Sequence, residues 1–272
     1  MNSNKPLAFF TILVIMLTVF LLNMTFAYKI SGHTLLFTRF AFVVVFYSAW
    51  RIFSAKGKSH TGDITFALMA VNLAFFTVSF FTPGLWNLNL ASAKGLAFAK
   101  LSDSVVICLV LLVSFLTAGY KPGSMFLAKG RLTPGLVIGI TAFILMAFVA
   151  IKTNAQPIGN DFVRRNLIWI LIFVFSNACM EELLFRGIFL HPANNFMKPV
   201  WAVVLTSIVF AAAHLQVTYT PDVVLFSGIT FVLAIAWGFL MLYTKSILAS
   251  MLFHAGSDLV IILPIYYSFG AI

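Results

Sequence analysis

Long apolar runs constrain this chain more than any other feature of its sequence. Runs near the length that a helix needs to cross a bilayer, about 20 residues, recur along the whole chain. Hydrophobic residues make up 62% of the 272 residues and charged residues only 9%, whereas a soluble globular domain carries roughly a quarter charged residues. The sequence therefore predicts an integral membrane protein, an all-α polytopic bundle of eight to nine transmembrane helices.

Nine segments are expected to span the membrane: residues 6–27, 35–53, 64–83, 103–120, 133–151, 167–190, 199–217, 223–244 and 246–263. The last segment is the weakest because it carries His254 and Asp258, and the alternative is a bundle of eight spans. Residues 84–102 are too polar to span, so we expect a short amphipathic segment at the membrane interface there. Gly135 and Gly139 form a small-xxx-small pair, which predicts that two helices approach closely.

The net charge of +10 comes mainly from Lys and Arg residues in the short connections between these segments. Membrane topology and anionic headgroups produce this pattern, and we expect no nucleic-acid partner. Ten basic residues fall on one side of a nine-span bundle and six on the other, which favours a cytoplasmic N-terminus in the cell (inner) membrane. The first run is longer than the apolar region of a signal peptide, so we expect it to remain as a helix.

A few ionisable side chains lie inside the apolar segments of the second half of the chain. An ionisable group at bilayer depth is costly unless it pairs with another or faces a polar cavity. Glu181 and Glu182 are the only two glutamates in the chain, and they are adjacent. The other members of the set, on the same segment or on two further ones, are Arg186, His214, His254 and Asp258.

Glu182 and Arg186 are four residues apart with the acid first, which is the favourable order for an ion pair on a helix. Glu181 is offset by about 100° around the helix and does not share this arginine equally. The simplest division makes Glu182–Arg186 a structural pair and leaves Glu181 for chemistry. In the alternative, both carboxylates flank the arginine and remain ionised.

His214 follows three alanines, and Phe210 lies one turn before it on the same helix face. Alanines allow helices to approach closely, which would bring the imidazole near other polar groups. The alternative is a histidine that only packs and hydrogen-bonds within the bundle.

His254 and Asp258 are again four residues apart and share one helix face. They form either a self-satisfied polar pair or part of a larger site. Gly256 and Ser257 between them reduce the packing there, as a water-accessible cavity would require.

Together these side chains supply three carboxylates, two imidazoles and one arginine on three helices that can pack together. Such a set can activate water for hydrolysis, with a carboxylate as base, a histidine that assists and polar groups that stabilise an oxyanion. It could instead hold a divalent metal, since carboxylates and imidazoles are zinc ligands. The zinc ligands would then be Glu181, His214, His254 and Asp258.

The same residues carry a resemblance to a known family. The patterns Glu181-Glu182-x-x-x-Arg186, Phe210-x-x-x-His214 and His254-x-x-x-Asp258 resemble, in order, the three motifs of the CAAX-protease and bacteriocin-processing (CPBP) family. The resemblance covers about residues 165–263, and residues 1–164 show no comparable signature. It implies accessory N-terminal helices in residues 1–164, about five spans, and a catalytic core in residues 165–272.

The resemblance implies an intramembrane endopeptidase of the abortive-infection or CAAX-prenyl-peptidase type. Residues matching Glu181 and His214 would activate water, and those matching His254 and Asp258 would stabilise the oxyanion. Glu182, Arg186 and Phe210 would support the site. The family is described both as glutamate-type and as metal-dependent; we favour the glutamate type without a firm cofactor, with zinc as the alternative.

One position departs from the family pattern, because Asp258 stands where the last motif often has asparagine. An ionised aspartate cannot donate a hydrogen bond to an oxyanion, whereas asparagine can. Asp258 is therefore kept protonated by apolar surroundings, or orients His254, or binds a metal.

Three functions compete for this set of residues. The favoured one is hydrolysis of a peptide bond in a membrane-anchored protein or peptide, such as a prenylated C-terminus, a leader or a C-terminal sorting tail. A proton-relay or transport protein also uses intramembrane Glu and His, but the first five spans hold few ionisable groups and no inverted repeat is visible. A non-catalytic immunity or scaffold protein would be expected to lack Glu181 or His214, and both are present.

Overall fold

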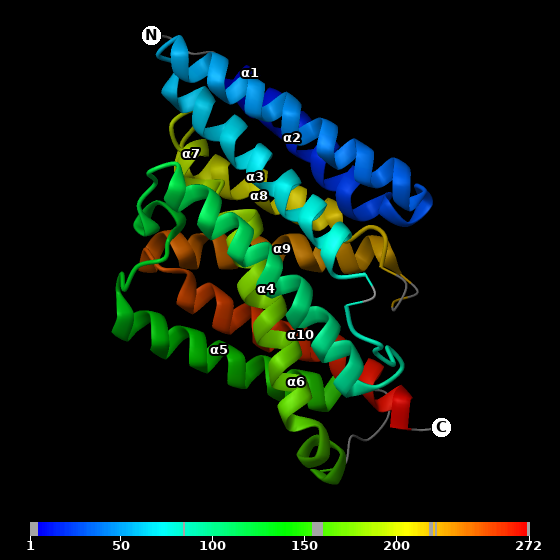
Figure 1. The fold of residues 1–272 in the computed structure, drawn as a ribbon. Helices are drawn as coiled ribbons and strands as arrows, with labels where there is room; N and C mark the ends of the chain where they lie inside the picture. Colours follow the sequence, from blue (N-terminus) through cyan, green and yellow to red (C-terminus); the bar gives the residue numbers. More distant parts are fainter. Residues whose placement is uncertain (1–4, 84, 154–159, 218–219, 221, 271–272) are drawn as a thin grey trace.

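The structure is a computed structural model and describes residues 5–83, 85–153, 160–217, 220 and 222–270. Within these residues the chain is helical and contains no strand. Figure 1 shows α1, α2 and α3 on one side of the bundle and α5 with α10 on the other, with α4 and α6 crossing between them. The predicted all-α bundle is confirmed.

Ten α-helices form the bundle in the described part of the chain: α1 Lys5–Phe20, α2 Gly32–Ala55, α3 Ser59–Phe81, α4 Ala93–Thr117, α5 Leu132–Thr153, α6 Asn160–Glu181, α7 Leu190–Ala193, α8 Pro199–Ala213, α9 Val223–Thr244 and α10 Ile247–Gly270. Eight helical segments of the described chain are long and apolar enough to cross a membrane, and α8 is a shorter apolar helix of 15 residues. The protein is therefore a multi-pass integral membrane protein.

The start of α4 corrects the prediction for residues 84–102. Residues 85–92 form turns, but α4 begins at Ala93, so the last ten residues of that segment are helical and continue into the span. Ser92 caps the helix by accepting a hydrogen bond from the Gly95 amide at 3.1 Å. The charge of Lys100 is accommodated because its ammonium lies over the Phe173 ring of α6, 5.6 Å from the centroid.

The helix α6 is longer than predicted and does not end as an ordinary α-helix. It begins at Asn160 rather than at residue 167, and at Glu182 it widens into the π-helix η4 Glu182–Gly187 before α7. A π-helical turn holds one extra residue per turn and occurs often at functional sites. This local change of geometry affects the segment that carries both glutamates and Arg186.

The helix α8 ends earlier than the predicted span 199–217, because its last helical residue is Ala213. The carbonyl groups at a helix end need hydrogen-bond donors, above all inside a bilayer. The hydroxyl of Thr25, in the π-helix η1 Leu21–Thr25 that follows α1, donates to the carbonyls of Ala212 and Ala213 at 3.2 and 3.4 Å. The N-terminal helices thus stabilise the end of α8.

A buried arginine fixes η1 against the neighbouring helices. Arg39 of α2 donates from Nε to the Asn23 side chain and from Nη2 to the Asn23 carbonyl, both at 2.8 Å. Asn23 in turn donates to Asn72 of α3 at 2.9 Å. Arg39 also binds Ser79 and the Phe75 carbonyl. These hydrogen bonds connect α2 and α3 to the segment that caps α8.

The predicted close approach at Gly135 and Gly139 takes place between α5 and α10. A Cβ atom added at Gly139 would lie 2.9 Å from the Leu252 side chain, and one at Gly256 would lie 2.7 Å from the Cα atom of Phe143. Gly256 therefore allows α10 to pack closely against α5. The expectation that this glycine opens a cavity is wrong. Close packing against α5 fixes the helix that carries His254 and Asp258.

Candidate active site

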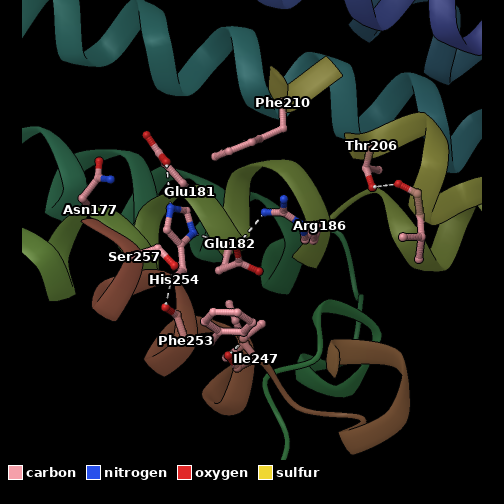
Figure 2. Close-up of polar contacts among 12 residues, drawn as sticks. Asn177, Glu181, Glu182, Arg186, Thr206, Phe210, Ile247, Phe253, His254 and Ser257 are labelled. Atoms are coloured by element: carbon pink, nitrogen blue, oxygen red, sulfur yellow. Dashed lines mark hydrogen bonds and ion pairs between the residues drawn. The ribbon is translucent and has the colours of Figure 1, made fainter. Parts of the chain in front are cut away.

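Glu182 and Arg186 form the most deeply buried ion pair of the described residues. Both side chains are fully buried, and Arg186 Nη1 lies 2.6 Å from Glu182 Oε1. Figure 2 shows this pair on the segment that carries Glu181. The expected pair is thus present, within the π-helix η4 rather than within a regular α-helix.

Aromatic rings provide most of the remaining environment of Arg186. Its guanidinium lies 4.7 Å from the ring centroid of Phe210 and 5.2 Å from that of Trp237. Its Nε and Nη2 atoms have no hydrogen-bond partner among the described residues. Arg186 thus makes its one ion pair with Glu182, and cation–π contacts with Phe210 and Trp237 provide its other favourable interactions.

His254 joins the two glutamates. Its Nδ1 lies 2.8 Å from Glu182 Oε1, and its Nε2 lies 3.4 Å from Glu181 Oε2 (Figure 2). The imidazole stacks on the Trp237 ring of α9 at 3.9 Å between centroids and an interplanar angle of 8°. The hydrogen bond to Glu182 and the stack on Trp237 together fix the orientation of the ring.

Asp258 uses both of its carboxylate oxygens within the site. Oδ2 accepts a hydrogen bond from Asn177 Nδ2 at 2.9 Å, and Oδ1 lies 3.5 Å from His254 Nε2. Of the two alternatives for His254 and Asp258, the structure shows the larger site, since the shorter contact of His254 is to Glu182 at 2.8 Å. The reason is that η4 brings Glu182 against α10, a contact that spacing along one helix cannot reveal.

His214 stands directly after α8 and is half-buried. Its Nδ1 lies 2.8 Å from the Phe210 carbonyl oxygen. A carbonyl oxygen only accepts hydrogen bonds, so Nδ1 carries a proton and Nε2 of the neutral ring has a free lone pair. The Phe210 ring separates the environments of His214 and Arg186, with its centroid 4.5 Å from that of His214.

Two cavities are lined by motif residues. The larger, which we call the site cavity, has a volume of about 360 Å³ and is lined by Glu181, His214, Asp258, Asn177, Lys100 and Gln216, with the apolar side chains Met24, Leu96, Phe173, Ala213, Val217, Ile261, Ile262 and Ile265. A second cavity of about 160 Å³ is lined by His214, His254, Ser257 and Asp258 together with residues of α5 and α9. His214 and Asp258 line both.

Three carboxylates of the site, Glu181, Glu182 and Asp258, are at least nine-tenths buried. Arg186 and His254 are the two basic groups in contact with them. Three negative groups against two positive ones leave an excess of one carboxylate when all are ionised. Glu181 makes a single ionic contact, to His254, and this contact is longer than an ordinary hydrogen bond. Of the three carboxylates, Glu181 is therefore the one held most weakly by other side chains of the site.

A metal would need several of these donors to converge on one point. In the described part of the chain, no group of three or more His, Cys, Asp and Glu side chains is arranged to hold a metal ion. The side chains as arranged therefore do not gather Glu181, His214, His254 and Asp258 into a zinc site.

All seven residues of the three motifs gather around one region of the bundle. The sequence did not identify three further residues there: Asn177, Lys100 and Trp237. A polar side chain one turn before Glu181 was a usable signal for Asn177. Lys100 was assigned to an interfacial segment, and nothing in the sequence connects Trp237 with His254.

Comparison with known families agrees with this arrangement. Residues 163–260 match the family model described as Type II CAAX prenyl endopeptidase Rce1-like. No match was found among curated proteins or among solved structures. The matched range contains the three motifs, and it corresponds to the CPBP resemblance of the sequence. Residues 163–260, which hold all three motifs, are therefore similar to the Rce1-like type II CAAX prenyl endopeptidases.

Proposed function

We propose that the protein is a glutamate-type intramembrane endopeptidase that hydrolyses a peptide bond of a membrane-anchored protein or peptide. The observation that carries this proposal is the site cavity, where Glu181, His214 and Asp258 line the same space. Its volume of about 360 Å³ lies in the range of ligand pockets, and its lining is mainly apolar with a few polar groups. Both features suit a water molecule and an apolar peptide segment.

In this proposal, Glu181 and His214 activate the water molecule. A water molecule between them would donate one hydrogen bond to the Glu181 carboxylate and the other to the free Nε2 of His214. Glu181 takes a proton from this water, and the resulting hydroxide forms a bond to the carbonyl carbon of the substrate. A correctly positioned general base contributes roughly 10²- to 10⁴-fold to such a reaction.

Stabilisation of the oxyanion involves His254. Its Nδ1 donates to Glu182, and the two carboxylates facing Nε2 favour a proton there as well. The distances of 3.4 and 3.5 Å from Nε2 to Glu181 and Asp258 are longer than ordinary hydrogen bonds. The Nε2–H group is therefore free to donate to an oxyanion. When the C–N bond breaks, Glu181 returns its proton to the leaving amine, so that one water is consumed without a covalent intermediate.

The location of the cavity among membrane-spanning helices supports a membrane-anchored substrate. Ile229, which lines the second cavity, is 52% exposed on the outside of the bundle, so a lipid-embedded chain could approach from that side. Prenylated C-termini, leaders and C-terminal sorting tails are the candidates. A cytoplasmic N-terminus, favoured by the distribution of Lys and Arg, is part of the same proposal.

The test is cleavage of membrane-tethered reporters, one for each candidate class, by the purified protein in proteoliposomes. The wild type is expected to cleave at least one reporter, and Glu181→Gln and His214→Gln are expected to lose at least about 100-fold of the rate. Asp161→Asn, which removes an exposed acid from the same helix as Glu181, should cleave like the wild type. A wild type that cleaves no reporter would favour a non-catalytic immunity or scaffold role.

A further inference from the structure

Asp258 cannot donate a hydrogen bond to the proposed oxyanion when it is ionised, so this position supplies no donor to the oxyanion site. Both of its carboxylate oxygens face donors, because Oδ2 accepts from Asn177 and Oδ1 faces His254 Nε2. A carboxylate has no hydrogen to give. A negative oxygen that developed beside Asp258 would therefore meet like charge unless another group supplied a donor.

Asn177 has the chemistry that is missing at position 258. Its amide nitrogen carries two N–H groups, and one of them donates to Asp258 Oδ2 at 2.9 Å. The second has no acceptor among the described residues. Asn177 is 7% exposed and lines the site cavity together with Glu181. It lies four residues before Glu181, so both side chains point to the same face of α6.

The carboxylate of Asp258 fixes which end of the amide faces the site. An ionised carboxylate attracts the NH₂ group and repels the carbonyl oxygen, so Asn177 is held with its nitrogen toward Asp258. The Oδ1 atom of Asn177 is buried and accepts no hydrogen bond from the described residues. This one-sided hydrogen bonding holds the donor end of the amide at the cavity that Glu181 and Asp258 also line.

We propose that Asn177 is a catalytic residue that donates its second N–H to the oxyanion of the tetrahedral intermediate, with Asp258 as the residue that positions the amide. The proposal rests on the proposed function. As the hydroxide oxygen bonds to the carbonyl carbon, the C=O electron pair moves to oxygen, and Asn177 and His254 both donate to it. When the C–N bond breaks, that pair re-forms C=O and the nitrogen takes the proton held by Glu181.

The proposal is tested by exchanging the amide and the carboxylate. Asn177→Leu removes the donor and Asn177→Asp replaces it with a second carboxylate, and each should lower kcat by about 10²- to 10³-fold with little change in KM. The double variant Asn177→Asp/Asp258→Asn restores one amide and one carboxylate on the same two helices. It should regain at least about tenfold of the kcat lost in Asn177→Asp, because an amide again faces the cavity.

A purely structural role for Asn177 would give a different result. A substrate-derived phosphinate peptide mimics the tetrahedral intermediate, and its affinity for Asn177→Leu should fall in parallel with kcat while substrate KM stays constant. Thermal unfolding of each variant in detergent serves as the folding control. If Asn177→Leu does not fold, Asn177→Ser, which keeps a hydroxyl donor, should retain at least tenfold more activity than Asn177→Ala.

Two results would overturn the inference while the proposed function stands. One is an Asn177→Leu enzyme within about threefold of the wild-type kcat beside an inactive Glu181→Gln enzyme. The other is a folded double variant no more active than Asn177→Asp. Failure of the proposed function is distinguishable, because the wild type would then cleave no reporter or Glu181→Gln would cleave as well as the wild type.

Discussion

Removing Glu182 should destabilise the protein strongly, and removing Arg186 at the same time should restore most of the lost stability. Both side chains are fully buried, and their 2.6 Å contact is the one ion pair that Arg186 makes among the described residues. Breaking a buried pair by removing one partner costs about 3–5 kcal/mol, because the remaining charge stays buried without compensation. We therefore expect Glu182→Leu and Arg186→Met each to lose about this amount of unfolding free energy.

The double variant leaves no buried charge from the pair. It leaves His254 Nδ1 without the acceptor that now lies 2.8 Å away, which costs about 1–3 kcal/mol. The two single losses sum to about 6–10 kcal/mol. The coupling energy of the cycle should therefore be at least about 3 kcal/mol.

The assay is equilibrium unfolding in mixed micelles, followed by circular dichroism. The matched control is the cycle for Asp161 and Arg164 on α6, whose side chains form a 3.5 Å ion pair and are each 83% exposed. The coupling energy of this control cycle should stay below about 1 kcal/mol. A Glu182–Arg186 coupling as small as that of the control would refute the reasoning. A double variant as unstable as the sum of the two single variants would refute it as well.

Two further predictions concern the elements that position the site. Gly256→Val should destabilise the protein by about 1–3 kcal/mol or more, because the added Cβ would lie 2.7 Å from the Phe143 backbone. The control is Gly228→Val, whose added Cβ has no atom within 4 Å and should cause no overpacking. Thermal unfolding measures both variants, and equal losses of stability would contradict the packing argument. Thr25→Val should lower both stability and cleavage, because the end of α8 loses its donor. In contrast, Thr18→Val removes only a bond within its own helix and should leave cleavage unchanged.

The sequence predicts the helices and the pairs that lie on one helix, and it fails where contacts depend on packing. Apolar length identifies eight of the nine predicted spans, whereas α8, within the predicted span 199–217, is a shorter helix. The spacing of four residues identifies the Glu182–Arg186 pair. The spacing of His254 and Asp258 equally suggested a pair, but the π-helix at Glu182 places its carboxylate 2.8 Å from His254. The spacing of residues along the segment does not predict this widened turn.

The contacts of polar groups on the N-terminal helices also depend on packing between helices. Lys100 lies in a segment that is polar enough to resemble an interfacial one. The segment is nevertheless helical, with Ser92 as its cap, and the Lys100 ammonium lies over the Phe173 ring of α6. The cap of α8 by Thr25 joins residues 187 positions apart, which a periodicity argument cannot detect. The sequence could have indicated Asn177 as a site residue, since it is a polar side chain one helical turn before Glu181.

The measurement that tests the central claim most directly combines activity and metal content in one purified preparation. Wild type and Glu181→Gln would be compared for reporter cleavage, with and without a chelator, and for bound metal per molecule by mass spectrometry. The account predicts chelator-resistant cleavage by the wild type without stoichiometric metal, and loss of cleavage in Glu181→Gln. Stoichiometric zinc in the wild type that disappears together with activity in Glu181→Gln would contradict it, because Glu181 would then be a metal ligand rather than the base.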